Sequence, residues 1–316
     1  MTGIPLLSNL GAFLAKPAFP RTSLSIAETE LAIVSLKRRA GEFEPTRLAM
    51  LPLPDGLLNA NFSEPNMSDE SAMVEELERL VSDAEMGRLR RLAVALPEGA
   101  ARSLVLTLET IPSSSTELAE VLAWKIERSF GCKPGDVRVT EKRLPTKDQR
   151  EWLVTVVYER VIAQYERVFK RLGWQVGLVL PAHLAEAEWL VRAGVNEDQV
   201  LLSLNERGFV AVVVRGRYPV LVREVTCPAT EREDEFHRIM VFYRDRMNAK
   251  DAPVSLHRML VVGPSEDHQR FRKTLAEALE SPVTVLDAPG LGLRLPARAP
   301  FPSFAAAAGL CTFAWA

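Results

Sequence analysis

The chain contains the same strand-and-turn construction twice, and this repeat constrains its fold more than any other feature. Residues 29–52 predict an apolar strand, a basic turn and a second strand, whereas residues 199–225 predict a series of strands joined by tight turns. Each set is followed by an amphipathic helix and then by a short apolar strand. Strands that alternate with helices are typical of α/β proteins, and their repetition predicts two lobes of related design.

The length and composition indicate an ordinary soluble globular protein with room for two domains. The chain has 316 residues, of which 47% are hydrophobic and 25% are charged. Its 39 basic and 41 acidic side chains give a net charge of -2, so we expect no nucleic-acid partner. Cys132, Cys227 and Cys311 form no CxxC pair, which favours buried thiols in a reducing compartment. No run reaches the roughly 18 apolar residues of a membrane helix, so we expect a cytoplasmic protein without a transmembrane segment.

Residues 1–21 predict an amphipathic extension that precedes the first lobe. Apolar residues recur at helical spacing from Leu6 to Leu14, and Pro17 and Pro20 then end the helix. The first basic residue, Lys16, follows the apolar stretch, whereas a signal peptide carries its basic residues before it. Two interpretations stay open: a helix docked on its own domain or on a partner, and a helix lying at a membrane surface.

The stretch between the two repeats predicts an inserted α+β subdomain. It contains a strand, a helix, two strands and a second helix, which Gly173 ends. A short buried strand at 174–181 and a helix then return the chain to the first lobe. The expected units are the first lobe at 22–98 and 174–197, the inserted subdomain at 99–173, and the second lobe at 198–316.

Motifs that would identify an enzyme are missing from the sequence. It contains no GxSxG, no HExxH, no P-loop and no GxGxxG after a strand. The histidines, which have no partner at metal-ligand spacing, are His183, His237, His257 and His268. We therefore predict no catalytic residues and no metal site.

The unit YERVIAQYERVFKRLGWQV, followed by a proline and an Ala-rich helix, is the most telling part of a similarity that extends over roughly residues 22–313. Through this unit and further segments, the sequence resembles the PilM family of type IV pilus assembly proteins, within the actin-like ATPase superfamily that includes FtsA. The other matching segments are SIAETELAIVSLKRR, RLAVALPEGAARSLVLTLETIPSSSTELAEVLAWKIERSF and PFPSFAAAAGL. The resemblance implies a two-lobed actin-like fold, which is a duplicated ribonuclease H-like fold, with an inserted α+β subdomain.

The phosphate-binding loops of that family are the places where this sequence departs from it. The family's first loop has an Asp, a Gly, several Ser or Thr and a Lys, and its second loop has an Asp and a Gly. The adenosine side of the family's site has a pair of glycines. These positions are held here by Ser25, Ala27, Glu28, Thr29, Glu30 and Ala32 in the first loop, by Ser203, Asn205, Glu206 and Arg207 in the second, and by Gly263 and Pro264 on the adenosine side.

The replacements work against a bound triphosphate. Phosphate binding needs backbone N–H groups without Cβ obstruction and a carboxylate that organises the metal. A glutamate about 4 Å from a phosphate charge costs ~1 kcal/mol in water and ~4 kcal/mol at the effective dielectric of a cleft. Arg207 would offset part of this repulsion by contacting phosphate directly. We expect no bound cofactor and no ATP turnover, and Mg-ATP held by these loops is the alternative.

The function implied by the resemblance is a non-catalytic cytoplasmic scaffold of type IV pilus assembly. Such a protein would bind the short cytoplasmic tail of a PilN-like inner-membrane protein in a groove between lobe and insert, and would also contact the pilus assembly ATPase. It would thus lie at the inner membrane through its partner. Two alternatives stay open. One is an active actin-like ATPase or sugar-kinase relative that uses Ser25 and Ser203, and the other is a cytoplasmic actin-like component of a type II secretion system.

Overall fold

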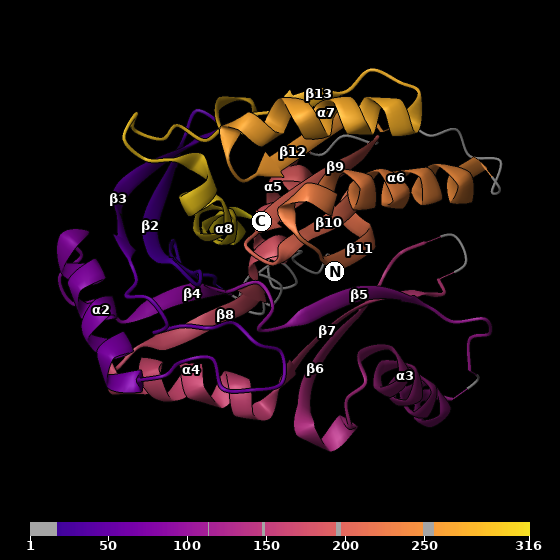
Figure 1. The fold of residues 1–316 in the computed structure, drawn as a ribbon. Helices are drawn as coiled ribbons and strands as arrows, with labels where there is room; N and C mark the ends of the chain where they lie inside the picture. Colours follow the sequence, from indigo (N-terminus) through magenta and orange to yellow (C-terminus); the bar gives the residue numbers. More distant parts are fainter. Residues whose placement is uncertain (1–17, 113, 147–148, 194–196, 249–255) are drawn as a thin grey trace, which may run out of the picture.

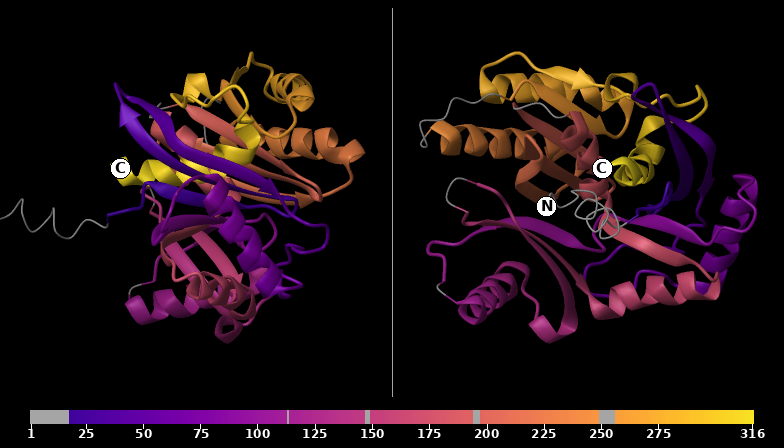
Figure 2. Two further views of the ribbon diagram at one scale, coloured as in Figure 1. Left: turned by 90° about the vertical axis from the view of Figure 1, so that its left-hand side faces the viewer. Right: turned by 180° about the vertical axis from the view of Figure 1, so that it is seen from behind.

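Two five-stranded sheets with equivalent strand orders form the framework of the molecule (Figure 1). The computed structural model describes residues 18–112, 114–146, 149–193, 197–248 and 256–316. The predicted N-terminal helix lies within residues 1–17, outside the described residues. In Figure 1 and in the reversed view of Figure 2, the second lobe lies above the insert, and β2 (Glu30–Arg39) and β3 (Glu42–Pro52) of the first lobe rise beside it.

The first sheet begins with three consecutive antiparallel strands. Its strands are β1 (Thr22–Ile26), β2 (Glu30–Arg39), β3 (Glu42–Pro52), β4 (Arg91–Leu96) and β8 (Gln175–Pro181), in the order β3-β2-β1-β4-β8. Strand β1 pairs antiparallel with β2 and parallel with β4. The repeat predicted at residues 29–52 contained only β2 and β3, whereas β1 corresponds to the first strand of the pair in the matching segment SIAETELAIVSLKRR, and it makes the two repeats more alike.

The second sheet repeats this topology. Its strands are β9 (Asp198–Asn205), β10 (Gly208–Arg215), β11 (Tyr218–Thr226), β12 (Arg258–Val262) and β13 (Thr284–Leu286), in the order β11-β10-β9-β12-β13. Strand β9 takes the place of β1, because it pairs antiparallel with β10 and parallel with β12. The β2–β3 and β10–β11 pairs each contain one register shift. The predicted two-lobed α/β fold is confirmed.

Amphipathic helices cover the outer face of each sheet. The first sheet is covered by α2 (Glu70–Asp83) and α4 (Glu159–Arg171), and the second by α6 (Arg232–Asn248) and α7 (Ser265–Leu279). Short 3-10 turns occur at Pro134–Asp136, Ala229–Glu231, Pro289–Leu291 and Phe313–Trp315. No helix among the described residues is both long and apolar enough to cross a membrane.

The insert is a small sheet with one helix packed on it. Its elements are β5 (Arg102–Thr107), α3 (Ser115–Phe130), β6 (Val137–Arg143) and β7 (Glu151–Tyr158), with the strand order β5-β7-β6. Ile126 and Phe130 of α3 pack with Val154 and Val156 of β7 in a separate core. Helix α4 falls within the range expected for the insert, yet its buried side chains belong to the core of the first lobe.

Two helices, α5 (Ala182–Ala193) and α8 (Phe301–Thr312), lie between the two sheets. Helix α5 follows β8 of the first sheet but contacts β9 and β10, whereas α8 follows the second sheet but contacts β1, β2 and β4. The indole Nε1 of Trp189 on α5 donates a hydrogen bond to the carbonyl oxygen of Ala305 on α8, at 2.9 Å. The expected ranges assigned α5 to the first lobe and α8 to the second, but the contacts show that each helix joins both lobes.

The crossing of α5 and α8 has room for glycine alone at position 309. A Cβ added to Gly309 would lie 2.0 Å from the carbonyl oxygen of Ala185, so Gly309→Ala must push the helices apart. We expect this variant to lower the free energy of unfolding by about 1–3 kcal/mol, measured by equilibrium unfolding in urea. A Cβ at Gly135 would meet open space, so Gly135→Ala is the matched control and should change stability by less than about 0.5 kcal/mol. Equal stabilities of the two variants would contradict the close crossing.

Candidate functional site

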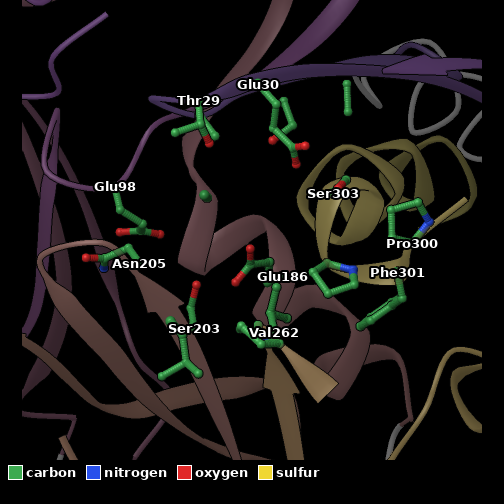
Figure 3. A pocket seen from close by; sticks show the side chains of 18 of the residues that line it. Thr29, Glu30, Glu98, Glu186, Ser203, Asn205, Val262, Pro300, Phe301 and Ser303 are labelled. Carbon is green, nitrogen blue, oxygen red and sulfur yellow. The ribbon is translucent and has the colours of Figure 1, made fainter. Parts of the chain in front are cut away.

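A cleft of about 1040 Å³ lies between the lobes, and we call it the interlobe cleft. Its walls come from the β1–β2 turn, the β9–β10 turn, the junction of β12 with α7, and the first turns of α5 and α8 (Figure 3). The loop positions singled out in the sequence all line it, namely Ser25, Ala27, Glu28, Thr29, Ser203, Asn205 and Gly263. The structure therefore brings together residues from three distant parts of the chain.

The first predicted loop is the turn between β1 and β2. Ser25 lies within β1, where it pairs with Ala32 of β2 and Ala95 of β4. The turn itself contains Ala27, Glu28 and Thr29, and the Ala27 N–H donates to the carbonyl oxygen of Glu30 at 2.9 Å. Every residue of this turn carries a Cβ, so the glycine that lets a phosphate approach the backbone is missing.

The second predicted loop follows β9, and Gly263 faces it from the end of β12. Ser203 is buried within β9, and the Oδ1 atom of Asn205 accepts a hydrogen bond from the backbone N–H of Arg207 at 3.0 Å. A Cβ on Gly263 would lie 2.7 Å from Cδ1 of Leu204. The close packing of the Leu204 side chain on β9 against Gly263, within the second lobe, thus explains the glycine at this position.

An ion pair connects the two predicted loops across the cleft. The Nη2 atom of Arg207 lies 2.7 Å from Oε1 of Glu28, and the same oxygen accepts the backbone N–H of Ala60 at 2.7 Å. Arg207 also donates to the side chain of Asn59. The carboxylate expected to repel phosphate and the guanidinium expected to attract it therefore bind each other through Nη2 of Arg207.

We expect Glu28 and Arg207 to be energetically coupled. A double-mutant cycle with Glu28→Ala and Arg207→Ala should give a coupling free energy of about 0.5–1 kcal/mol, because Arg207 is partly exposed whereas Glu28 is mostly buried. Urea unfolding of the wild type, both single variants and the double variant measures it. The exposed pair of Lys273 and Glu277 on α7 is the control and should give about 0.3 kcal/mol. Additive effects of the two substitutions at 28 and 207 would show that the pair does not hold the loops together.

The start of α5 is fixed by a carboxylate from the β4–β5 connection. Oε1 of Glu98 accepts the backbone N–H of His183 at 2.5 Å, and Oε2 lies 2.9 Å from the ring Nδ1 of the same residue. His183 is almost completely buried. Its partner is 85 residues away, so the sequence alone showed only an isolated histidine.

One turn later, α5 places a second carboxyl group in the cleft. Glu186 is only 5% exposed, and its Oε2 atom has no hydrogen-bond partner among the described residues. Burial, together with the nearby charge of Glu98, raises the pKa of Glu186 well above its usual range, and a hydrogen bond with the Ser203 hydroxyl offsets part of this increase. Figure 3 shows Glu186 between Ser203 and Glu30.

Sequence reasoning missed Glu98 and Glu186. A signal for Glu186 was present, because two glutamates interrupt the small and apolar residues of the segment AHLAEAEWLV, and such residues usually lie on a buried helix face. No comparable signal marks Glu98. Across the described ranges, no group of three or more His, Cys, Asp or Glu side chains is arranged to hold a metal ion.

Comparison with solved structures supports the architecture. The chain resembles a structure described as a PilM-PilN type IV pilus biogenesis complex, with a TM-score of 0.72, 16% sequence identity, and coverage of 94% of this chain and 99% of that one. A protein of Bacteroides thetaiotaomicron with an actin-like ATPase fold gives a TM-score of 0.46, 10% identity, and 84% and 91% coverage. The cytoplasmic domain of EpsL from the type II secretion system of Vibrio cholerae gives a TM-score of 0.46 and 13% sequence identity, with coverage of 77% of this chain and 82% of that one.

No protein-family model and no curated protein matches the sequence. At these identities the similarity concerns the fold. The molecule has a two-lobed actin-like fold with an inserted α+β subdomain.

Proposed function

We propose that this protein is a non-catalytic scaffold of type IV pilus assembly that binds the cytoplasmic tail of a PilN-like inner-membrane protein. The observation that carries the proposal is its similarity, over nearly the full length of both chains, to the structure of the PilM-PilN complex. In this role the protein would lie in the cytoplasm, at the inner membrane through its partner. The pilus assembly ATPase is a further expected partner.

A role in binding rather than catalysis is supported by the loops of the interlobe cleft. The turn at 27–29 lacks glycine, and its Glu28 is paired with Arg207 of the opposite lobe. An actin-like ATPase needs both loops free to surround a phosphate chain and its metal. The pair supplies a connection between the lobes that does not require a nucleotide, so we propose a pseudo-ATPase.

A second pocket lies where the insert meets both lobes, and we call it the insert pocket. It has a volume of about 460 Å³. Its aromatic residues are Phe62, Phe130 and Tyr158, and the rings of Phe62 and Tyr158 meet edge-on at 5.1 Å. The charged residues that line it are Glu98, Arg102, Arg207 and Glu224.

The insert pocket has the chemistry that recognises a short peptide. The Arg102 guanidinium lies 4.5 Å from the centre of the Phe62 ring, and its Nε atom lies 3.7 Å from Oε2 of Glu224. Phe62 and Phe130 are almost completely buried, so the pocket offers a peptide mainly its charged groups of both signs, which are partners for backbone and polar groups. We therefore propose the insert pocket as the place where the tail of the PilN-like protein binds.

The test is calorimetry of the full chain with a synthetic peptide that corresponds to the cytoplasmic tail of the PilN-like protein of the same organism. We expect binding, and we expect Thr226→Trp to weaken it by roughly tenfold or more, because the indole would fill the pocket beside exposed Thr226.

Thr140→Trp is the matched control, since Thr140 is an exposed strand residue outside the pocket. Its affinity for the peptide should equal that of the wild type. No binding at millimolar peptide would contradict the proposed partner, whereas equal affinity of both variants would contradict the insert pocket as its site.

An actin-like ATPase is the second candidate, because the predicted loop positions do line one cleft large enough for a nucleotide. On the scaffold proposal, the melting temperature should stay constant when Mg-ATP or Mg-ADP is added to millimolar concentration. A ligand at 100 times its Kd stabilises the folded state by about 2.7 kcal/mol, which a thermal-shift titration detects readily. Magnesium-free ATP controls for ionic strength. A saturable increase of the melting temperature with Mg-ATP, and none with magnesium-free ATP, would favour the ATPase candidate.

A further inference from the structure

We propose that the interlobe cleft binds a small organic cation, a primary amine with an apolar body, whose ammonium group lies against Glu186. This inference is independent of the pilus role, because it concerns a ligand of the cleft and not the partner of the insert pocket. It rests on an open buried acceptor, on the charge of the lining and on the division of the cleft into a polar and an apolar side.

The open acceptor is Oε2 of Glu186. The residue is more than nine-tenths buried, it lines the cleft, and this oxygen has no partner in the described part of the chain. A buried polar atom without a partner costs free energy, and a ligand donor that reaches it removes this cost. Around Glu186, the side chains of Thr29, Ser203 and Asn205 supply further oxygen atoms (Figure 3).

The lining of the cleft favours a cation over an anion. Its carboxyl groups outnumber its guanidinium groups, and Nη2 of each guanidinium already binds an oxygen atom of the protein. Nη2 of Arg207 binds Glu28, and Nη2 of Arg232 lies 2.7 Å from the carbonyl oxygen of Asn205, whereas Nε of Arg232 is a buried donor without a hydrogen-bond partner among the described residues. The carboxylates are Glu28, Glu30, Glu98, Glu186, Glu206 and Asp287. An anionic ligand would meet net repulsion here, whereas an ammonium would be attracted.

The apolar wall gives the ligand a carbon body. In Figure 3, Glu98, Ser203 and Asn205 lie on one side of Glu186, and Pro300 and Phe301 lie on the other. Ile26, Ala182, Val262 and Leu286 add to the apolar surface of the cleft. A bare metal ion would leave this surface unused, whereas an amine with an aromatic or aliphatic body would contact it.

The electrostatic environment of Glu186 is compatible with such a ligand. Burial and the charge of Glu98 raise the pKa of the Glu186 carboxyl well above its usual range. A bound ammonium would place an opposite charge within hydrogen-bond distance and would lower that pKa. Glu98 does not compete as the acceptor, because its two oxygens already bind the backbone and ring of His183.

The experiment compares ligands of nearly the same shape and different charge. The full chain is titrated by calorimetry with 2-phenylethylammonium, 2-phenylethanol and phenylacetate. We expect the ammonium to bind roughly tenfold or more tightly than either of the other two. No binding of the ammonium at millimolar concentration, or equal affinity for all three compounds, would overturn the proposal.

Variants locate the site. Glu186→Gln should remove the preference for the ammonium, a loss of roughly tenfold in its affinity. Glu188→Gln is the matched control, because Glu188 is also a buried carboxyl on α5 but does not line the cleft, and it should keep the preference. Ser203→Ala is a second, independent variant and should weaken ammonium binding severalfold. Thermal melting verifies that each variant is folded. Unchanged ammonium affinity in both Glu186→Gln and Ser203→Ala would show that the compound binds elsewhere.

Discussion

The arrangement of this molecule depends on the close packing of α5 against α8 between the two sheets. Because Gly309 has no side chain, the backbone of α8 comes close to the carbonyl oxygen of Ala185, and the Trp189 indole binds across to Ala305. Each helix enters from one lobe and packs on the sheet of the other. The same two helices form the floor of the interlobe cleft, so one packing contact fixes both the relation of the lobes and the position of Glu186.

Most of the fold could be predicted from the sequence because it depends on local apolar periodicity. The repeated strands and their covering helices have clear patterns, and the resemblance to the PilM family implied how they assemble. Strand β1 was not part of the repeat predicted from periodicity, because TSLSI is short and half polar, and it was expected only from the resemblance of SIAETELAIVSLKRR to a strand pair of the PilM family. The lobe to which α4, α5 and α8 belong could not be predicted from periodicity, since an apolar helix face does not identify the sheet that it will cover. The residue ranges of the lobes thus stay a prediction, refined by these contacts.

The candidate site was only partly predictable, for a physical reason. The loop positions could be located because each follows a predicted strand. The two sheets have equivalent strand orders, and the loops that follow β1, β9 and β12 line the same cleft. The contacts that give the site its character are long-range. Glu28 and Arg207 are separated by 179 residues, and Glu98 and His183 by 85. Charge alone identifies both members of such pairs as surface residues, and only the fold shows that they meet.

The Glu28–Arg207 pair also shows how the two sides of this cleft are connected within the protein. In a nucleotide-dependent fold, the ligand itself joins the lobes, so substitutions in the loops weaken the whole assembly. Here the ion pair, the Ala60 N–H bond to Glu28 and the α5–α8 crossing make the connection within the protein. The lobes are thus connected without a bound ligand, and the cleft between them contains a buried carboxyl group beside an apolar wall. The interlobe cleft and the insert pocket are neighbours, because Glu98, Asn205 and Arg207 line both of them.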